Sequence, residues 1–191
     1  WLVGSVLRGF VVDGFWYGKA QGVKWTPDEM GLANFSGSGE NSGGVLFCGD
    51  DHAAKSSVNP GASEEALRDM KVPVFYPATV EEVLRCAHHA LALSRYSGLV
   101  TALKLVTPLC DGAGTVRVDP EEPRVVLPDF EVDGRPYQKR FHPIVLATAS
   151  VPIEAELMTA RLDAARAYAR ANGLNEIVHA GAGSRLGIVA T

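Results

Sequence analysis

The sequence predicts an α/β fold, in which a parallel sheet is flanked by helices, and three observations support this prediction. Between residues 45 and 106, apolar runs of strand length alternate with segments in which apolar residues recur at helical spacing. The run at residues 45–48 is continuously apolar, as in strands buried on both faces of a parallel sheet. A dense polar loop follows this run, at the edge where open α/β sheets bind ligands.

The first 108 residues are expected to contain strands and helices in alternation. The expected strands lie at residues 9–17, 45–48, 72–76 and 99–106, and the expected helices at 63–70 and 80–95. Ser63 is the predicted N-cap of the shorter helix. Thr79 and Glu82 form a capping-box pattern before the longer helix, and Gly98 follows its end.

The sequence changes character after Pro108. Residues 109–150 are rich in proline, glycine and short β-prone stretches, which predicts a β-rich linker with a hairpin at 131–135 turning at its Asp-Gly pair. A strong helix is expected at 152–172, followed by Gly173. Apolar runs at 177–179 and 186–190 are predicted to be strands that open a further α/β unit. The sheet is therefore expected to be incomplete, as part of a longer protein.

Composition narrows the possible classes of function. Hydrophobic residues make up 47% and charged residues 21% of the 191 residues, values typical of a soluble globular protein. A net charge of −4 gives no electrostatic basis for binding nucleic acid or an anionic membrane, and no apolar run reaches the roughly 18 residues of a membrane span. Three widely spaced cysteines indicate neither a metal knuckle nor a disulfide framework, which favours a reducing, cytoplasmic location.

Several motifs contain residues typical of binding sites. Residues 14–20 resemble a phosphate-binding loop but place Ala20 where Ser or Thr should hold magnesium. The glycine-rich stretches at 37–39 and 181–183 precede predicted strands, whereas a dinucleotide-binding turn opens a helix. Asp50, Asp51 and His52 carry metal-ligating groups, but three consecutive side chains rarely converge on one ion, so we favour a ligand-binding loop there. The paired histidines 88 and 89 are interpreted as structural.

Five short motifs lie in order along most of the chain. They are Trp-Tyr-Gly-Lys at 16–19, Gly-Gly-Val-Leu at 43–46, Gly-Asp-Asp-His-Ala-Ala-Lys-Ser-Ser at 49–57, Ala-Leu-Ser-Arg-Tyr-Ser-Gly at 92–98 and Arg-Leu-Gly-Ile-Val at 185–189. The nine-residue block is the most specific of them. Together they resemble the large fused indolepyruvate:ferredoxin oxidoreductases, over residues 14–191.

The resemblance implies an enzyme that oxidatively decarboxylates a 2-oxoacid on thiamine diphosphate with Mg²⁺. Ferredoxin would receive the electrons through iron–sulfur clusters, and coenzyme A the acyl group. Residues 1–108 would be the later half of a pyrimidine-type thiamine-diphosphate-binding domain, 109–150 the linker, and 151–191 the start of the next α/β domain. The activating glutamate, the magnesium site and the clusters would lie elsewhere, so the fragment is expected to be inactive alone. A homo-oligomer or an intimate domain pair is expected.

The resemblance also implies roles for individual residues. Lys19 would be the catalytic cation that binds the carboxylate of the 2-oxoacid. The cofactor-binding residues would be Tyr17, Gly18, Asp50, Asp51, His52, Lys55 and Ser56, and no metal ligand is assigned. After Lys19 the family's Gly-Pro-Gly-Val-Asp-Arg is replaced by residues 20–25, Ala-Gln-Gly-Val-Lys-Trp, and the histidine of its His-Gly-Gly is Ser42 here. These departures favour a related aryl or branched 2-oxoacid.

One alternative function stays open, and another is disfavoured. A trimmed pyrimidine-type domain could serve as a non-catalytic module for assembly or regulation. A flavodoxin-like binding domain is disfavoured, because no phosphate loop precedes a helix.

Overall fold

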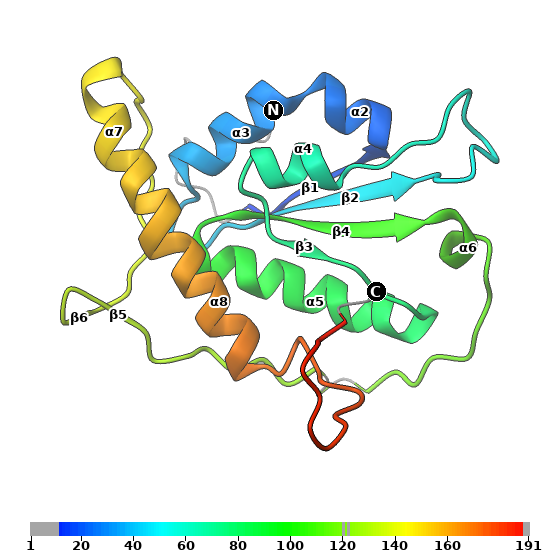
Figure 1. The fold of residues 1–191 in the computed structure, drawn as a ribbon. Coiled ribbons are helices and arrows are strands. Elements are labelled where there is room, and N and C mark those ends of the chain that lie inside the picture. The colour runs from blue at the N-terminus through cyan, green and yellow to red at the C-terminus, as the bar shows by residue number, and fades with distance from the viewer. Residues whose placement is uncertain (1–11, 120, 122, 189–191) are drawn as a thin grey trace.

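The computed structural model describes residues 12–119, 121 and 123–188, and its centre is a four-stranded, all-parallel sheet (Figure 1). The strands are β1 (Gly14–Lys19), β2 (Gly44–Asp50), β3 (Val74–Phe75) and β4 (Val100–Val106), in the order β1-β2-β4-β3. Each neighbouring pair is parallel. Together with the helices on both faces, this arrangement confirms the predicted α/β class.

Helices cover the two faces of the sheet unequally. One face carries α2 (Ala20–Trp25), α3 (Pro27–Ser36) and α4 (Glu64–Asp69), and the other carries α5 (Val80–Ser97), as Figure 1 shows. A core on the first face includes Val23, Leu46 and Leu67, each 3% exposed or less. On the other face of β1, the side chains of Phe15 and Tyr17 are 56% and 85% exposed.

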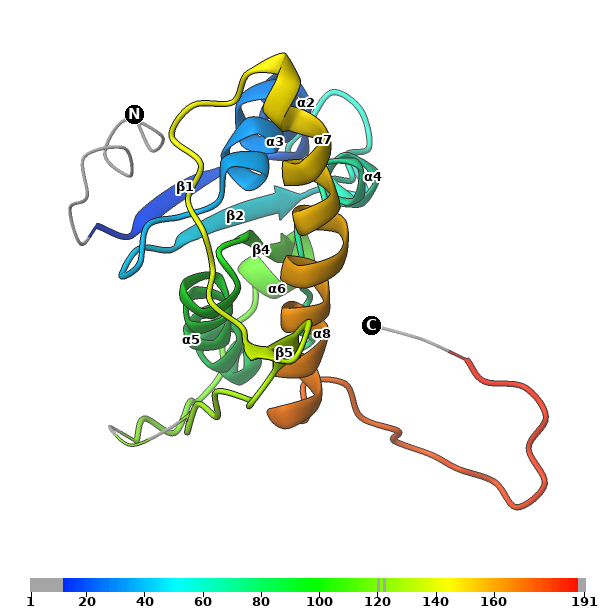
Figure 2. The ribbon, with the colours of Figure 1, turned by 90° about the vertical axis from the view of Figure 1, so that its left-hand side faces the viewer.

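A long helical rod covers a second hydrophobic core, which includes Leu93 and Leu99. It consists of α7 (Ala147–Glu156), a π-helical turn η1 (Leu157–Arg161) and α8 (Leu162–Ala171), which run on from one another (Figures 1 and 2). Tyr168 of α8 is fully buried, and its hydroxyl lies 2.9 Å from Nδ1 of His89 on α5. The rod begins before the predicted start at Pro152, which lies inside α7 instead of in its first turn. The predicted structural role of His89 agrees with this contact.

The caps of α5 and the hairpin turn predicted from local sequence patterns are present in the structure. The Thr79 Oγ1 atom accepts a hydrogen bond from the Glu82 amide at 3.2 Å, and Gly98 ends α5 with φ +79°. The predicted hairpin is present as β5 (Glu131–Val132) and β6 (Arg135–Pro136). Asp133 and Gly134 have φ values of 52° and 72°, as a two-residue type I′ turn requires.

Other predicted elements differ from the structure. The strand expected at 9–17 begins at Gly14, with residues 9–11 outside the described part of the chain, and the strand at 72–76 shortens to β3. Ser63 does not cap α4 through its side chain, because it binds Asp50 instead. The described residues 177–179 and 186–188 form no strand and are fully exposed; 189 and 190 lie outside the described residues. A strand needs a neighbour to satisfy its backbone, and the described chain pairs none with them.

Candidate ligand site at the carboxyl edge of the sheet

The carboxyl ends of β1, β2 and β4 meet at one edge of the sheet. Lys19 is the last residue of β1 and pairs with Gly49, while Asp50, at the end of β2, pairs with Val106, at the end of β4. The loop at 51–62 and the short helix α6 (Thr107–Cys110) leave the sheet from this edge. Open α/β sheets bind their ligands in this position, so the motif at 49–57 lies where a site is expected.

Lys19 is hydrogen-bonded to the loop that follows β2. Its ammonium donates to the Ser56 carbonyl oxygen at 2.7 Å, to Ser56 Oγ at 3.2 Å and to Ser57 Oγ at 3.1 Å. The lysine side chain is exposed, so these contacts lie at the surface. One cation and two hydroxyl groups thereby converge at the end of β1, a donor set that suits a carboxylate or a phosphate.

Asp51 fixes the shape of the same loop from inside. Its carboxylate accepts hydrogen bonds from the backbone amides of Ser56 at 2.7 Å and Lys55 at 2.8 Å. These contacts, chiefly the one from Ser56, lower the pKa of the Asp51 carboxyl to about 2. Asp51 is buried, at 5% exposure, so its charge organises the loop and does not face a ligand from solvent.

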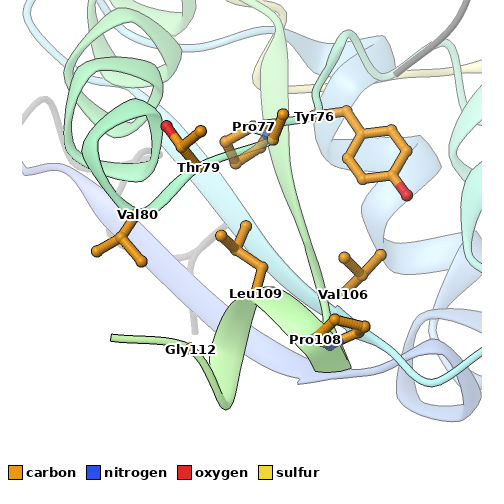
Figure 3. Close-up of a pocket in the computed structure, with 9 residues that line it drawn as sticks. Tyr76, Pro77, Thr79, Val80, Val106, Pro108, Leu109 and Gly112 are labelled. Carbon is orange, nitrogen blue, oxygen red and sulfur yellow. The ribbon is translucent and has the colours of Figure 1, made fainter. Parts of the chain in front are cut away.

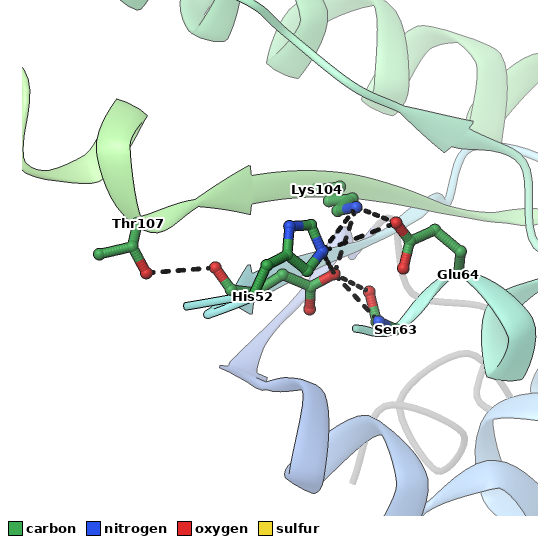
Figure 4. Close-up of polar contacts among 6 residues, drawn as sticks. His52, Ser63, Glu64, Lys104 and Thr107 are labelled. Atoms are coloured by element: carbon green, nitrogen blue, oxygen red, sulfur yellow. Dashed lines mark hydrogen bonds and ion pairs between the residues drawn. The ribbon is translucent and has the colours of Figure 1, made fainter. Parts of the chain in front are cut away.

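Asp50 belongs to a polar cluster at this edge, in which Asp50 and Lys104 are buried and the side chains of His52 and Glu64 are 45% and 47% exposed. Figure 4 shows His52, Ser63, Glu64 and Lys104 of this cluster. Its Oδ2 atom accepts from the Ser63 amide at 3.0 Å and from Ser63 Oγ at 2.9 Å, and lies 3.6 Å from Lys104 Nζ. Lys104, on β4, also forms an ion pair with Glu64 and lies 3.3 Å from His52 Nε2. The Lys104 side chain is 1% exposed and that of Asp50 is fully buried. Asp50, His52, Glu64 and Lys104 are called the carboxyl-edge cluster below.

Three members of the carboxyl-edge cluster carry groups that can ligate a metal ion. Asp50, His52 and Glu64 each offer a ligand atom, and these atoms lie within 4.8 Å of one another. The ammonium of Lys104 already lies among them and supplies a positive charge. A divalent ion would have to displace this ammonium, because two cations at such distances repel strongly.

The sequence motifs located the site but missed part of its composition. Ser63, Glu64 and Lys104 were not predicted as site residues, although Lys104 interrupts the apolar run of a strand whose residues 100–103 are all buried. Since lysine is almost never fully buried without a partner, that interruption was the available signal. Its partners lie 40 or more residues away in sequence, which local patterns do not reveal.

The remaining predicted residues occupy different parts of this edge. Tyr17 and Lys19 lie two residues apart on β1, hence on the same face of the sheet, and both are exposed. Gly18 leaves room for the indole of Trp16, since a Cβ atom there would lie 2.5 Å from a ring carbon. Lys55 is exposed and pairs with Asp111, beyond α6. The structure thus brings Lys19 and Ser56 together and turns the carboxylates of Asp50 and Asp51 inward.

Fold and site together define an α/β domain with a polar loop at the carboxyl edge of a parallel sheet. The chain is similar to the indolepyruvate oxidoreductase subunit IorA of Methanothermobacter thermautotrophicus, with 27% identity over 154 residues. The matched region covers 81% of this chain and 24% of that protein, so the chain spans about a quarter of the length of this relative. This similarity supports a distant relationship to the 2-oxoacid:ferredoxin oxidoreductases.

Neither a family model nor a solved structure matches the chain. No helix among the described residues has the length and apolar character needed to cross a membrane.

Proposed function

We propose that this chain is part of an oxidoreductase that oxidatively decarboxylates an aryl 2-oxoacid to an acyl-coenzyme A, with ferredoxin as electron acceptor. The observation that carries the proposal is the similarity to an indolepyruvate oxidoreductase subunit over 81% of the chain. The polar edge supports it independently, because it presents a cation and hydroxyl groups where α/β sheets bind ligands.

Lys19 is the proposed contact for the carboxylate of the 2-oxoacid. Its ammonium is exposed, and Ser56 and Ser57 hold it at the end of β1. A carboxylate that binds there would replace one hydroxyl as an acceptor of the Lys19 ammonium, whose three donors are directed to Ser56 and Ser57. It would then accept a charge-assisted hydrogen bond from Lys19 and further hydrogen bonds from the hydroxyl groups. Lys19 would thus orient the group that leaves as carbon dioxide.

Thiamine diphosphate is the proposed cofactor, and when bound it supplies the electron sink for decarboxylation. The residues proposed to contact this anionic, phosphate-bearing molecule are Tyr17, Gly18, His52, Lys55 and Ser56; the side chains of Tyr17, His52, Lys55 and Ser56 are exposed at this edge. Asp50 and Asp51 would act indirectly, since their carboxylates hold the loop and Ser63. Magnesium and the iron–sulfur clusters are proposed to lie on other domains of the complete enzyme.

A lysine substitution in the native protein that contains this chain tests the proposal. Lys19→Ala should lower kcat/KM for indolepyruvate by about 10- to 100-fold, the loss expected for one hydrogen bond to a charged group. Lys19→Arg should retain part of the activity, and Lys24→Ala, which removes an exposed lysine on α2, should change little. The assay is viologen reduction with coenzyme A and a panel of aryl and small 2-oxoacids.

Two results would count against different parts of the proposal. Normal turnover by Lys19→Ala would remove the role of Lys19 but leave the activity. Failure of the native protein to bind thiamine diphosphate and to oxidise any 2-oxoacid would remove the oxidoreductase function, and would favour the assembly or regulatory module.

A further inference from the structure

A pocket of about 370 Å³ opens at the same edge of the sheet, beside the carboxyl-edge cluster (Figure 3). One wall is the segment between β3 and α5, and the other is the end of β4 with α6. The side chains that line it include Pro77, Val80, Val106, Pro108 and Leu109, with Tyr76 at one side. Neither β1 nor the loop at 49–57 contributes to it.

The chemistry of the lining favours an uncharged, apolar group. None of the residues that line the pocket carries a charge. The helix α5 begins at this pocket, but two donors at its amino end are already occupied. The Glu82 amide donates to Thr79 Oγ1, and the Ala78 amide donates to the Glu82 carboxylate at 2.7 Å. The lining therefore offers no cation to a carboxylate or phosphate, whereas an apolar ring that contacts it is partly removed from water.

The size and stiffness of the pocket suit a planar ring. Small-molecule sites occupy roughly 300–1,000 Å³ and are lined mainly by apolar side chains with few polar groups. Pro77 and Pro108 stand on opposite walls and restrict the backbone there, because proline fixes φ. A pocket with two restricted walls loses little conformational entropy when a ligand binds.

The pocket is joined to the polar edge through Tyr76, which lines it, and through Thr107, which lies between the lining residues Val106 and Pro108. The ring of Tyr76 lines the pocket and also lies under the Lys104 ammonium, 4.3 Å from ring centroid to nitrogen. Thr107 begins α6, and its hydroxyl donates to the Asp50 carbonyl oxygen at 3.3 Å. β4 lies two strand spacings from β1, about 10 Å.

We infer that this pocket binds the aromatic ring of the 2-oxoacid and sets the preference for aryl over small substrates. The assignment of the ring to a 2-oxoacid rests on the proposed function. The affinity of the pocket for a neutral aromatic ring rests on the lining alone.

Filling the pocket in the native protein tests the inference. Leu109→Trp should lower kcat/KM for indolepyruvate and phenylpyruvate by about 10- to 200-fold, the range for a changed fit in an apolar pocket, while kcat/KM for pyruvate changes little. The matched control is Leu84→Trp, on α5 outside the pocket, where the side chain is 38% exposed. It should leave both values unchanged. An equal loss for aryl and small substrates, or no loss, overturns the inference.

A binding measurement separates this inference from the proposed function. Indole is added as a probe, and the methyl NMR signals of Val106 are followed in the parent and the variant, with those of Val80 in the parent and in Leu109→Trp. These signals should shift in the parent protein and not in the variant. Such shifts without any 2-oxoacid oxidation would support an aromatic-binding pocket and contradict the proposed function. Oxidation of aryl 2-oxoacids without such shifts would support the proposed function and overturn the inference that this pocket binds the ring. If Leu109→Trp fails to fold, Val80→Phe replaces it, with the same expected results.

Discussion

Asp50 and Asp51 are adjacent at the end of β2, but their carboxylates make different contacts. Asp50 is directed into the protein, where it holds Ser63 and lies near Lys104, and its Oδ1 atom has no hydrogen-bond partner among the described residues. Asp51 binds two backbone amides of the loop that follows. The sequence predicted both as cofactor-binding residues, and that role stays a prediction. The direction in which each carboxylate points depends on partners that the motif does not contain, such as Ser63 and Lys104.

Asp51 predicts a pH dependence of the loop at 51–57. The pKa of its carboxyl is lowered from the ordinary 3.8 to about 2, chiefly by the Ser56 amide. A lowered pKa in the folded state means that the stabilisation is present above about pH 4 and is lost as the pH falls through about 2. Carbon-13 NMR titration of the Asp51 carboxyl should show this low midpoint, and Asp51→Asn should flatten the pH dependence of unfolding between pH 4 and 2. A midpoint near 3.8 would contradict the prediction.

At the scale of elements, α4 is attached to the sheet through its first residues. Ser63 precedes the helix and Glu64 begins it, and they bind Asp50 on β2 and Lys104 on β4. Local sequence predicted the helix and a Ser63 cap, but the contact with Asp50 replaces the cap. In α5, by contrast, the Thr79 cap is confirmed, because its partner Glu82 lies three residues away and needs no tertiary contact.

Lys104 is therefore expected to stabilise the junction of β2, β4 and α4. Lys104→Met should lower the free energy of unfolding by about 3–5 kcal/mol, because it leaves the buried Asp50 carboxylate without its cation. Urea denaturation measures the change, and Lys24→Met on α2 is the exposed control. The double variant Asp50→Asn/Lys104→Met should recover part of the loss, since it removes both charges. An unchanged unfolding midpoint in Lys104→Met would contradict this account.

At the scale of the molecule, the helical rod and the sheet form one packed unit. Arg161 of the rod is fully buried and donates to the carbonyl oxygens of Asn34 and Phe35 on α3 at 3.0 and 3.1 Å. It also pairs with Glu156 on the preceding turn at 2.8 Å. Residues 175–188, by contrast, are exposed throughout and extend away from the sheet (Figure 2). The division of the chain at 108 and 150 stays a prediction.

This contrast predicts an order of proteolytic cleavage for the chain expressed as residues 1–191. Brief digestion with trypsin should cut first at basic residues that are exposed and outside helices, which include Lys55, Arg117, Arg124, Arg140 and Arg185. Arg161 should be cut last, because its guanidinium and backbone are buried in the rod. Mass spectrometry of the early fragments identifies the sites. Early cleavage at Arg161 would show that the rod does not pack as described.

The sequence by itself determined the features that depend on near neighbours. Strand and helix alternation, the Thr79 cap, the Gly98 end and the Asp133–Gly134 turn all follow from side-chain preferences within a few residues. It also located the polar loop, because parallel strands end at one edge. Only the tertiary structure decided that Lys104 is buried between Asp50 and Glu64, that Ser63 binds Asp50, and that residues 177–188 form no strand. These outcomes depend on contacts between distant segments, and on the presence or absence of a neighbouring strand, which no local pattern specifies.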